Sequence, residues 1–185
     1  MTKEEFYSVG YKIFPSCLND EDVRDCIVAI NTWTQKFSQM GYVFIQDVYS
    51  DPAFVRVSKT PFLLDQLRVF TGGEPEVYNS AAVIAYPELK PPRATVWHID
   101  KNSPDGSGVK VVFYFTDVSR ENCGNTYIKP GSHGIKDNPD LPVMQVTCPA
   151  GSVIMYRTDL WHSPSVNTSK VTRKALFLSY KKTDV

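Results

Sequence analysis

The chain has 185 residues, of which 42% are hydrophobic and 12% aromatic, and its formal net charge at pH 7 is zero. This length suits one domain with a packed core, and the balanced charge argues against a nucleic-acid-binding or membrane-surface protein, because both normally carry a basic excess. No apolar leader and no apolar run long enough to cross a bilayer is visible, so we expect a soluble, cytoplasmic protein.

The four cysteines are dispersed along the chain and form no Cys-X-X-Cys pair; they are Cys17, Cys26, Cys123 and Cys148. This spacing argues against a zinc knuckle or a dithiol redox site. We expect reduced and mostly buried thiols.

The first third of the chain predicts helices separated by short strands. A helix over residues 2–9 has a capping box at Thr2 and stops at Gly10, and a strand follows at 11–14. The clearest helix opens within residues 18–22, with either Asn19 or Asp20 as its cap. Its apolar face is formed by Val23, Cys26, Ile27, Ile30, Trp33 and Phe37. A strand at 43–45 precedes a further helix, which begins at Thr60-Pro61 and ends at Gly72-Gly73.

From residue 74 onward, short extended runs alternate with turn residues. The predicted strands cover 77–86, 94–100, 109–116, 126–129, 144–148, 152–156 and 173–181. Such a succession is typical of an all-β barrel or sandwich. No linker divides the helical third from the strands, so we expect a single domain over residues 1–185.

Residues 95–100, Thr-Val-Trp-His-Ile-Asp, close one predicted strand with a His-X-Asp motif. Side chains two residues apart in a strand point to the same face, so His98 and Asp100 can converge on one point. Two such groups and a distant histidine form the 2-His-1-carboxylate site of non-haem iron oxygenases. A lone His-X-Asp also arises by chance, and the alternative is a surface histidine beside a solvated aspartate.

His162 is suitably placed to be the distal histidine. It follows a tight turn at 149–152 and a buried strand at 153–156. The alternative, a core histidine bonded to the backbone, is favoured when His162 is considered by itself. The metal interpretation rests on its combination with His98 and Asp100.

Arg173 opens an apolar run, and strand parity places it on one face with Ala175, Phe177 and Ser179. An interior arginine is costly unless it meets an anion, and its planar guanidinium suits a carboxylate. This predicts binding of a 2-oxo acid beside the metal. The alternative is a solvated arginine at a strand start, near Lys170 and Lys174.

Taken together, these segments resemble the phytanoyl-CoA dioxygenase-like family of Fe(II)/2-oxoglutarate-dependent oxygenases. Residues 97–100 resemble its Trp-His-X-Asp motif, and residues 115–133 resemble its Glu-Asn-Gly turn and Pro-Gly-Ser-His segment. Residues 150–162 are similar to the segment before its distal histidine, and Asn167 and Arg173 match the Asn and Arg that follow. The likeness covers nearly the whole chain, and its ordered combination is specific although each piece alone is weak.

The resemblance implies a mainly β (α+β) fold: a double-stranded β-helix, or cupin-like jelly roll, with N-terminal helices packed outside. It implies Fe(II) held by His98, Asp100 and His162, and 2-oxoglutarate held by Arg173. With O2 as the second co-substrate, the implied reaction is a dioxygenase oxidation that releases succinate and CO2. The aspartate argues against halide transfer, because that variant of the family has Ala or Gly there, so hydroxylation of a small molecule is expected.

Further assignments from the resemblance concern the co-substrate pocket. In the family, a Ser or Thr just after the distal histidine assists the arginine that binds 2-oxoglutarate. This chain instead has Ser163 and Ser165 on either side of Pro164, and either could serve; we choose Ser165 for this role. Phe113, which we place on the inward parity of its strand, matches an aromatic that lines the pocket. His133 is expected to make loop hydrogen bonds and not to bind metal.

The polar segment 101–108 is either a lid over the site or an ordinary connection. The functional alternatives are a non-catalytic jelly-roll protein that binds a metal or small acid, and a metal-dependent hydrolase or isomerase on a similar barrel. An intact ligand set together with Arg173 favours the oxygenase over the binding protein. With only three histidines, the chain offers few ligands for a hydrolase.

Overall fold

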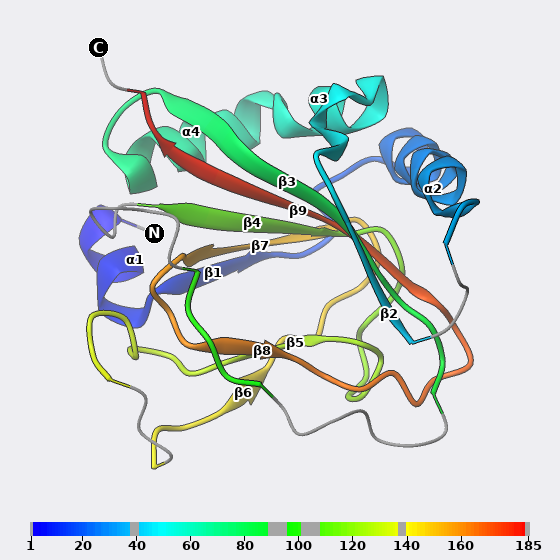
Figure 1. Ribbon diagram of the computed structural model, residues 1–185. Helices are drawn as coiled ribbons and strands as arrows, with labels where there is room; N and C mark the ends of the chain where they lie inside the picture. Colours follow the sequence, from blue (N-terminus) through cyan, green and yellow to red (C-terminus); the bar gives the residue numbers. More distant parts are fainter. Residues whose placement is uncertain (1, 38–40, 89–95, 101–107, 137–139, 184–185) are drawn as a thin grey trace.

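The computed structural model describes residues 2–37, 41–88, 96–100, 108–136 and 140–183. Two antiparallel sheets face each other, and the helices cover the outer face of the larger sheet (Figure 1). The larger sheet has the strand order β1-β7-β4-β9-β3-β2, and the smaller sheet has the order β6-β5-β8. This is the two-sheet architecture predicted from the sequence.

The larger sheet contains six strands drawn from the whole chain: β1 (Tyr11–Phe14), β2 (Tyr42–Gln46), β3 (Pro75–Ala85), β4 (Val109–Tyr114), β7 (Ser152–Arg157) and β9 (Arg173–Lys182). The smaller sheet contains β5 (Thr126–Ile128), β6 (Met144–Gln145) and β8 (His162–Pro164). One core fills the space between the large sheet and the helices, and a second lies between the two sheets. Residues of the helical third and of the strands belong to the same core on the helix side.

The predicted helix ends agree well with the structure. Helix α1 (Lys3–Val9) has a complete capping box between Thr2 and Glu5 and ends at Gly10, where φ is 85°. Helix α2 (Asp20–Thr34) is capped by the Asn19 side chain, and α4 (Pro61–Thr71) ends at Gly72 in the left-handed conformation. Phe37 departs from expectation, because α2 ends before it and its side chain is exposed.

Two short helical elements were not predicted: the 3-10 helix η1 (Val48–Ser50) and helix α3 (Pro52–Ser58). Helix α3 is capped by Asp51, with Pro52 at its first position. Its seven residues are too few to produce a recognisable apolar period.

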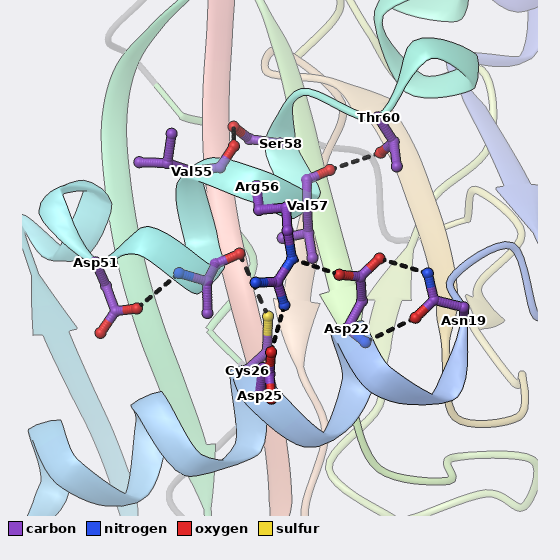
Figure 2. Close-up of polar contacts among 11 residues, drawn as sticks. Asn19, Asp22, Asp25, Cys26, Asp51, Val55, Arg56, Val57, Ser58 and Thr60 are labelled. Carbon is purple, nitrogen blue, oxygen red and sulfur yellow. Dashed lines mark hydrogen bonds and ion pairs between the residues drawn. The ribbon is translucent and has the colours of Figure 1, made fainter.

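Polar contacts join α3 to α2 across the outside of the sheet (Figure 2). Arg56 lies 2.7 Å from Asp22 and 2.6 Å from Asp25, and Asp22 also accepts a hydrogen bond from the Asn19 amide. The Cys26 thiol beneath contacts the Ala53 carbonyl, and burial raises its pKa to about 12. All four cysteines are free, and three of them are buried, as expected.

The alternation along β4 decides which residues reach the space between the sheets. Val109, Val111 and Phe113 belong to the core under the helices. Val112 and Tyr114 belong to the core between the sheets. The prediction that Phe113 lines the co-substrate pocket is therefore wrong, since its ring packs on the helix side.

Of the predicted strand 94–100, residues 94 and 95 lie outside the described part of the chain, and residues 96–100 form only an isolated bridge at His98. Apart from Gly108, the segment 101–108, interpreted either as a lid or as an ordinary connection, also lies outside it. Within the described residues, no helix has the length and apolar character needed to cross a membrane.

Candidate active site

His98 and His162 are brought together by the backbone itself. The two residues form an isolated antiparallel bridge, in which each backbone N–H donates to the other residue's carbonyl at 3.0 Å. Their ring centroids lie 4.3 Å apart. Two histidines that are 64 positions apart in the sequence (162 − 98) thus lie side by side at the β8 edge of the smaller sheet.

Each imidazole is oriented by a carbonyl two residues earlier in the chain. His98 Nδ1 lies 3.0 Å from the Val96 carbonyl, and His162 Nδ1 lies 2.9 Å from the Leu160 carbonyl. A carbonyl only accepts, so each Nδ1 carries the proton in the neutral ring, and each Nε2 keeps its lone pair. This second hydrogen bond is the usual way in which proteins orient a metal-binding histidine.

Asp100 supplies a carboxylate oxygen to the same point. Its backbone N–H donates to the Thr158 carbonyl at 2.8 Å, and its Oδ2 lies 3.8 Å from His162 Nε2. Oδ2 is buried and has no hydrogen-bond partner. Lys110 Nζ lies 3.1 Å away, at ion-pair distance but without hydrogen-bond geometry.

The donor set fits iron. One ligand atom each from His98, Asp100 and His162 can be chosen so that all lie within 4.8 Å of one another, and together they are the two nitrogens and one oxygen of the 2-His-1-carboxylate site. Burial lowers the pKa of His162 to about 4, so its ring is neutral and able to bind metal at neutral pH. The unpaired Asp100 oxygen is a further sign of fit, because buried carboxylate oxygens normally have partners.

His133 lies elsewhere, beside Gly10 in the first helix-to-strand junction. Among the described residues, it does not belong to the group that could hold a metal.

Arg173 lies almost completely buried at the start of β9. Its guanidinium donates to the Gly124 carbonyl at 2.8 Å, to the Val83 carbonyl at 3.1 Å and to the Tyr42 hydroxyl. All three acceptors are neutral, and no ion pair joins Arg173 to a carboxylate of the described chain. A buried cation that has only neutral partners is well suited to receive an anion.

Hydroxyl groups gather around Arg173 from four other strands. Tyr42 comes from β2, and Tyr114 of β4 shares a 2.7 Å hydrogen bond with Thr126 of β5. Tyr156 of β7 is fully buried, and its hydroxyl has no hydrogen-bond partner. Burial raises the pKa of Tyr156, and its ring lies beside that of His162, with the two centroids 4.9 Å apart.

A cavity of about 210 Å³ opens beside the metal ligands. Its wall contains the three ligands together with Tyr42, Phe44, Lys110, Thr126, Ser163, Pro164 and Phe177. Ser165 lines a neighbouring cavity, which shares the Tyr42 wall, and its hydroxyl contacts the Val166 carbonyl. Thr126 and Ser163 thus line the cavity beside the candidate metal ligands, whereas Ser165 does not.

Several of these residues had no signal in the sequence. In the sequence, Lys110 is a single basic residue within an otherwise apolar strand. Tyr42, Thr126 and Tyr156 lie on strands that become neighbours only when the chain folds. Asn167 was matched to the family, and here its side chain organises a turn by donating to the Ala85 and Val171 carbonyls at 2.7 and 2.8 Å.

The sequence model of the family described as phytanoyl-CoA dioxygenase (PhyH) matches residues 43–175, well over half of the chain. The chain belongs to the phytanoyl-CoA dioxygenase family. It is accordingly a non-haem iron, 2-oxoglutarate-dependent enzyme, and the predicted jelly roll and cofactors are confirmed. No protein of curated function matches the sequence.

Solved structures with the same fold are numerous. The carbocyclase SnoK of nogalamycin biosynthesis is 19% identical, with a TM-score of 0.84 over 99% of this chain and 83% of that one. The epimerase SnoN, in complex with Fe3+, α-ketoglutarate and nogalamycin RO, is 17% identical, with a TM-score of 0.82 over 97% and 82%. EctD from S. alaskensis is 18% identical, with a TM-score of 0.80 over 97% and 75%.

Proposed function

We propose that this enzyme hydroxylates a small organic molecule, using Fe(II), 2-oxoglutarate and O2 and releasing succinate and CO2. The observation that carries the proposal is the convergence of His98, Asp100 and His162 beside a buried arginine with no anionic partner. When bound, iron and 2-oxoglutarate supply the oxidising chemistry, and the protein contributes binding, orientation and exclusion of water.

In this proposal His98 and His162 bind iron through Nε2, and Asp100 binds it through Oδ2. Arg173 binds the distal carboxylate of 2-oxoglutarate, with the Thr126 and Tyr42 hydroxyls beside it. The unpartnered Tyr156 hydroxyl, whose ring lies beside that of His162, donates to the co-substrate. In this proposal Thr126, and not Ser165, is the hydroxyl residue beside the bound 2-oxoglutarate.

The solved relatives include a carbocyclase and an epimerase, so this fold serves several oxidative outcomes. Hydroxylation is favoured here because Asp100 retains the third protein ligand and so leaves no place for a halide at that position. The relatives bound to α-ketoglutarate also contain small molecules, nogalamycin RO in SnoN and 5-hydroxyectoine in EctD. These complexes support a small-molecule substrate.

The test is spectroscopic and anaerobic. Fe(II) and then 2-oxoglutarate are added to the metal-free protein, and the visible charge-transfer band of the complex is recorded for wild type, His162→Ala and Arg173→Gln. We expect a band that requires both additions, is lost in the His162 variant and needs much more 2-oxoglutarate in the Arg173 variant.

His133→Ala and Arg120→Gln are the matched controls, because both residues lie outside the cavity wall. They should give the wild-type band. A wild-type protein that shows no band with Fe(II) and 2-oxoglutarate, although folded, would overturn the proposal.

A further inference from the structure

Lys110 is the one charged residue in the described cavity wall to which the proposed function gives no role. It lies on β4, and its side chain is only 9% exposed. Lysine is seldom buried to this degree unless it is paired, because removing an ammonium group from water is costly. A lysine that lines a cavity from within a core strand therefore calls for an anion.

The only anionic partner of Lys110 within the described chain is Asp100, which is itself a proposed metal ligand. The two groups lie 3.1 Å apart without forming a hydrogen bond. When Asp100 binds a divalent cation, its charge is shared with that cation, and the same cation repels the ammonium group. The pairing with Asp100 then becomes too weak to balance a buried lysine.

The formal charges of the loaded site lead to the same point. Iron(II) brings two positive charges, and Lys110 and Arg173 bring one each, whereas Asp100 brings one negative charge and 2-oxoglutarate two. The distal carboxylate of 2-oxoglutarate is matched by Arg173 and its other end by the metal. One positive charge is left over, and it lies on Lys110.

The rest of the cavity wall is apolar on one side. Tyr42 and Phe44 lie on the same face of the edge strand β2, with exposed fractions of 44% and 48%, and Phe177 and Pro164 continue this wall. Large exposed aromatic side chains beside a cavity are suited to contact an apolar ligand body. The cavity thus combines an apolar wall with a single unmatched cation.

We propose that Lys110 is a specificity-determining residue that binds a carboxylate of the primary substrate, so that the substrate is a small organic acid with an apolar body. This inference rests on the proposed function and deepens it. Lys110 holds the acid group near the metal ligands, and the aromatic wall of β2 holds the rest of the molecule. Lys110 takes no part in binding 2-oxoglutarate.

Matched acid and amide pairs test the inference: phenylacetate with phenylacetamide, and hexanoate with hexanamide. Each compound is titrated into the anaerobic protein–Fe(II)–2-oxoglutarate complex, and binding is read from the perturbation of the charge-transfer band and from calorimetry. We expect wild type to bind the acids roughly ten- to a hundredfold more tightly than the amides, which is the fold change that corresponds to a charge-assisted hydrogen bond.

Lys110→Met should lose this preference, and Lys110→Arg should keep part of it, while both retain the band with Fe(II) and 2-oxoglutarate. Lys181→Met is the matched control, because Lys181 pairs with Glu76 at the far end of β9, and it should behave as wild type.

Three outcomes would overturn the inference and leave the proposed function standing. In the first, wild type forms the band but binds acids and amides alike, or binds neither at millimolar concentration. In the second, Lys110→Met keeps the preference for acids. In the third, Lys110→Met loses the band that Lys110→Arg retains, which assigns Lys110 to the metal or the co-substrate. Absence of the band in wild type instead rejects the proposed function itself.

Discussion

At the scale of single residues, two buried tyrosines on neighbouring strands differ in one respect. Tyr114 shares a hydrogen bond of 2.7 Å with Thr126, whereas the Tyr156 hydroxyl has no partner. An unsatisfied buried hydroxyl destabilises a folded protein, while a satisfied one contributes modestly to its stability. The proposed role of Tyr156 as a donor to the co-substrate explains why such a cost is retained.

Tyr156→Phe should therefore raise the free energy of unfolding of the metal-free protein by about 1 kcal/mol, because it removes an unpaired hydroxyl and keeps the ring. The same variant should bind 2-oxoglutarate less tightly in the anaerobic spectroscopic titration. Urea unfolding measures the first effect. A substitution that stabilises the fold but weakens co-substrate binding is the result expected for a side chain retained for function.

Tyr114→Phe is the control, since it deletes a hydroxyl that is paired. It leaves the Thr126 hydroxyl without its partner, so the free energy of unfolding should fall by about 1 kcal/mol. Equal destabilisation by the two changes would contradict the assignment of an unpaired Tyr156.

At the scale of elements, the junction between α1 and β1 shows how tightly the helices are fixed to the sheets. Gly10 has a φ of 85°, ends α1 and accepts a hydrogen bond from the Arg157 backbone at 2.9 Å. A Cβ at this position would lie 2.6 Å from Leu160 Cδ1 and 2.9 Å from His133 Nδ1. Both the backbone conformation and the close packing thus require glycine.

Gly10→Ala should lower the free energy of unfolding by about 3 kcal/mol, from left-handed strain and from overpacking against Leu160. Gly134→Ala is a matched control: its φ is 72°, but an added Cβ would meet nothing within 4 Å. That variant should lose only about 1 kcal/mol. Equal losses in urea unfolding would show that packing at the junction contributes little.

The elements also show what the sequence can predict. Helix ends are set by local chemistry, so the cap at Thr2, the cap at Asn19 to within one residue, and the stop at Gly72-Gly73 could be assigned from neighbouring residues alone. Strand β4 is different, because both of its faces are buried and its sequence does not alternate between polar and apolar. Parity was therefore assigned wrongly at Phe113. On β9, parity grouped Ala175 and Phe177 with Arg173 without deciding whether that face is interior, and the structure places both in the core between the sheets.

At the scale of the whole molecule, the candidate metal ligands could be proposed from the sequence because His-X-Asp and the distal histidine each follow a recognisable local pattern. The surroundings of Arg173 could not be predicted from the sequence, because their residues come from four strands, β2, β4, β5 and β7. Which of these strands are neighbours depends on sheet order, and sheet order is a property of the complete chain. Lys110 and Tyr156 were missed for this reason.

The assembly of the metal site also predicts how cofactor binding changes the molecule. Three backbone hydrogen bonds join the metal-ligand stretch to the rest: two between His98 and His162, and one from Asp100 to Thr158. Metal ligands on both sides of this contact add a further link. Fe(II) binding should therefore oppose any opening that separates residues 96–100 from residues 158–162.

Anaerobic hydrogen exchange with and without Fe(II) tests this prediction. At a metal concentration about a hundred times the dissociation constant, the amides of His98, Asp100 and His162 should gain up to about 2.7 kcal/mol of protection. The exposed first turn of α1, which opens locally, should not change. In His98→Ala the gain should disappear, because one side of the link is lost. Unchanged exchange at these three amides, despite confirmed metal binding, would place the metal elsewhere in the molecule.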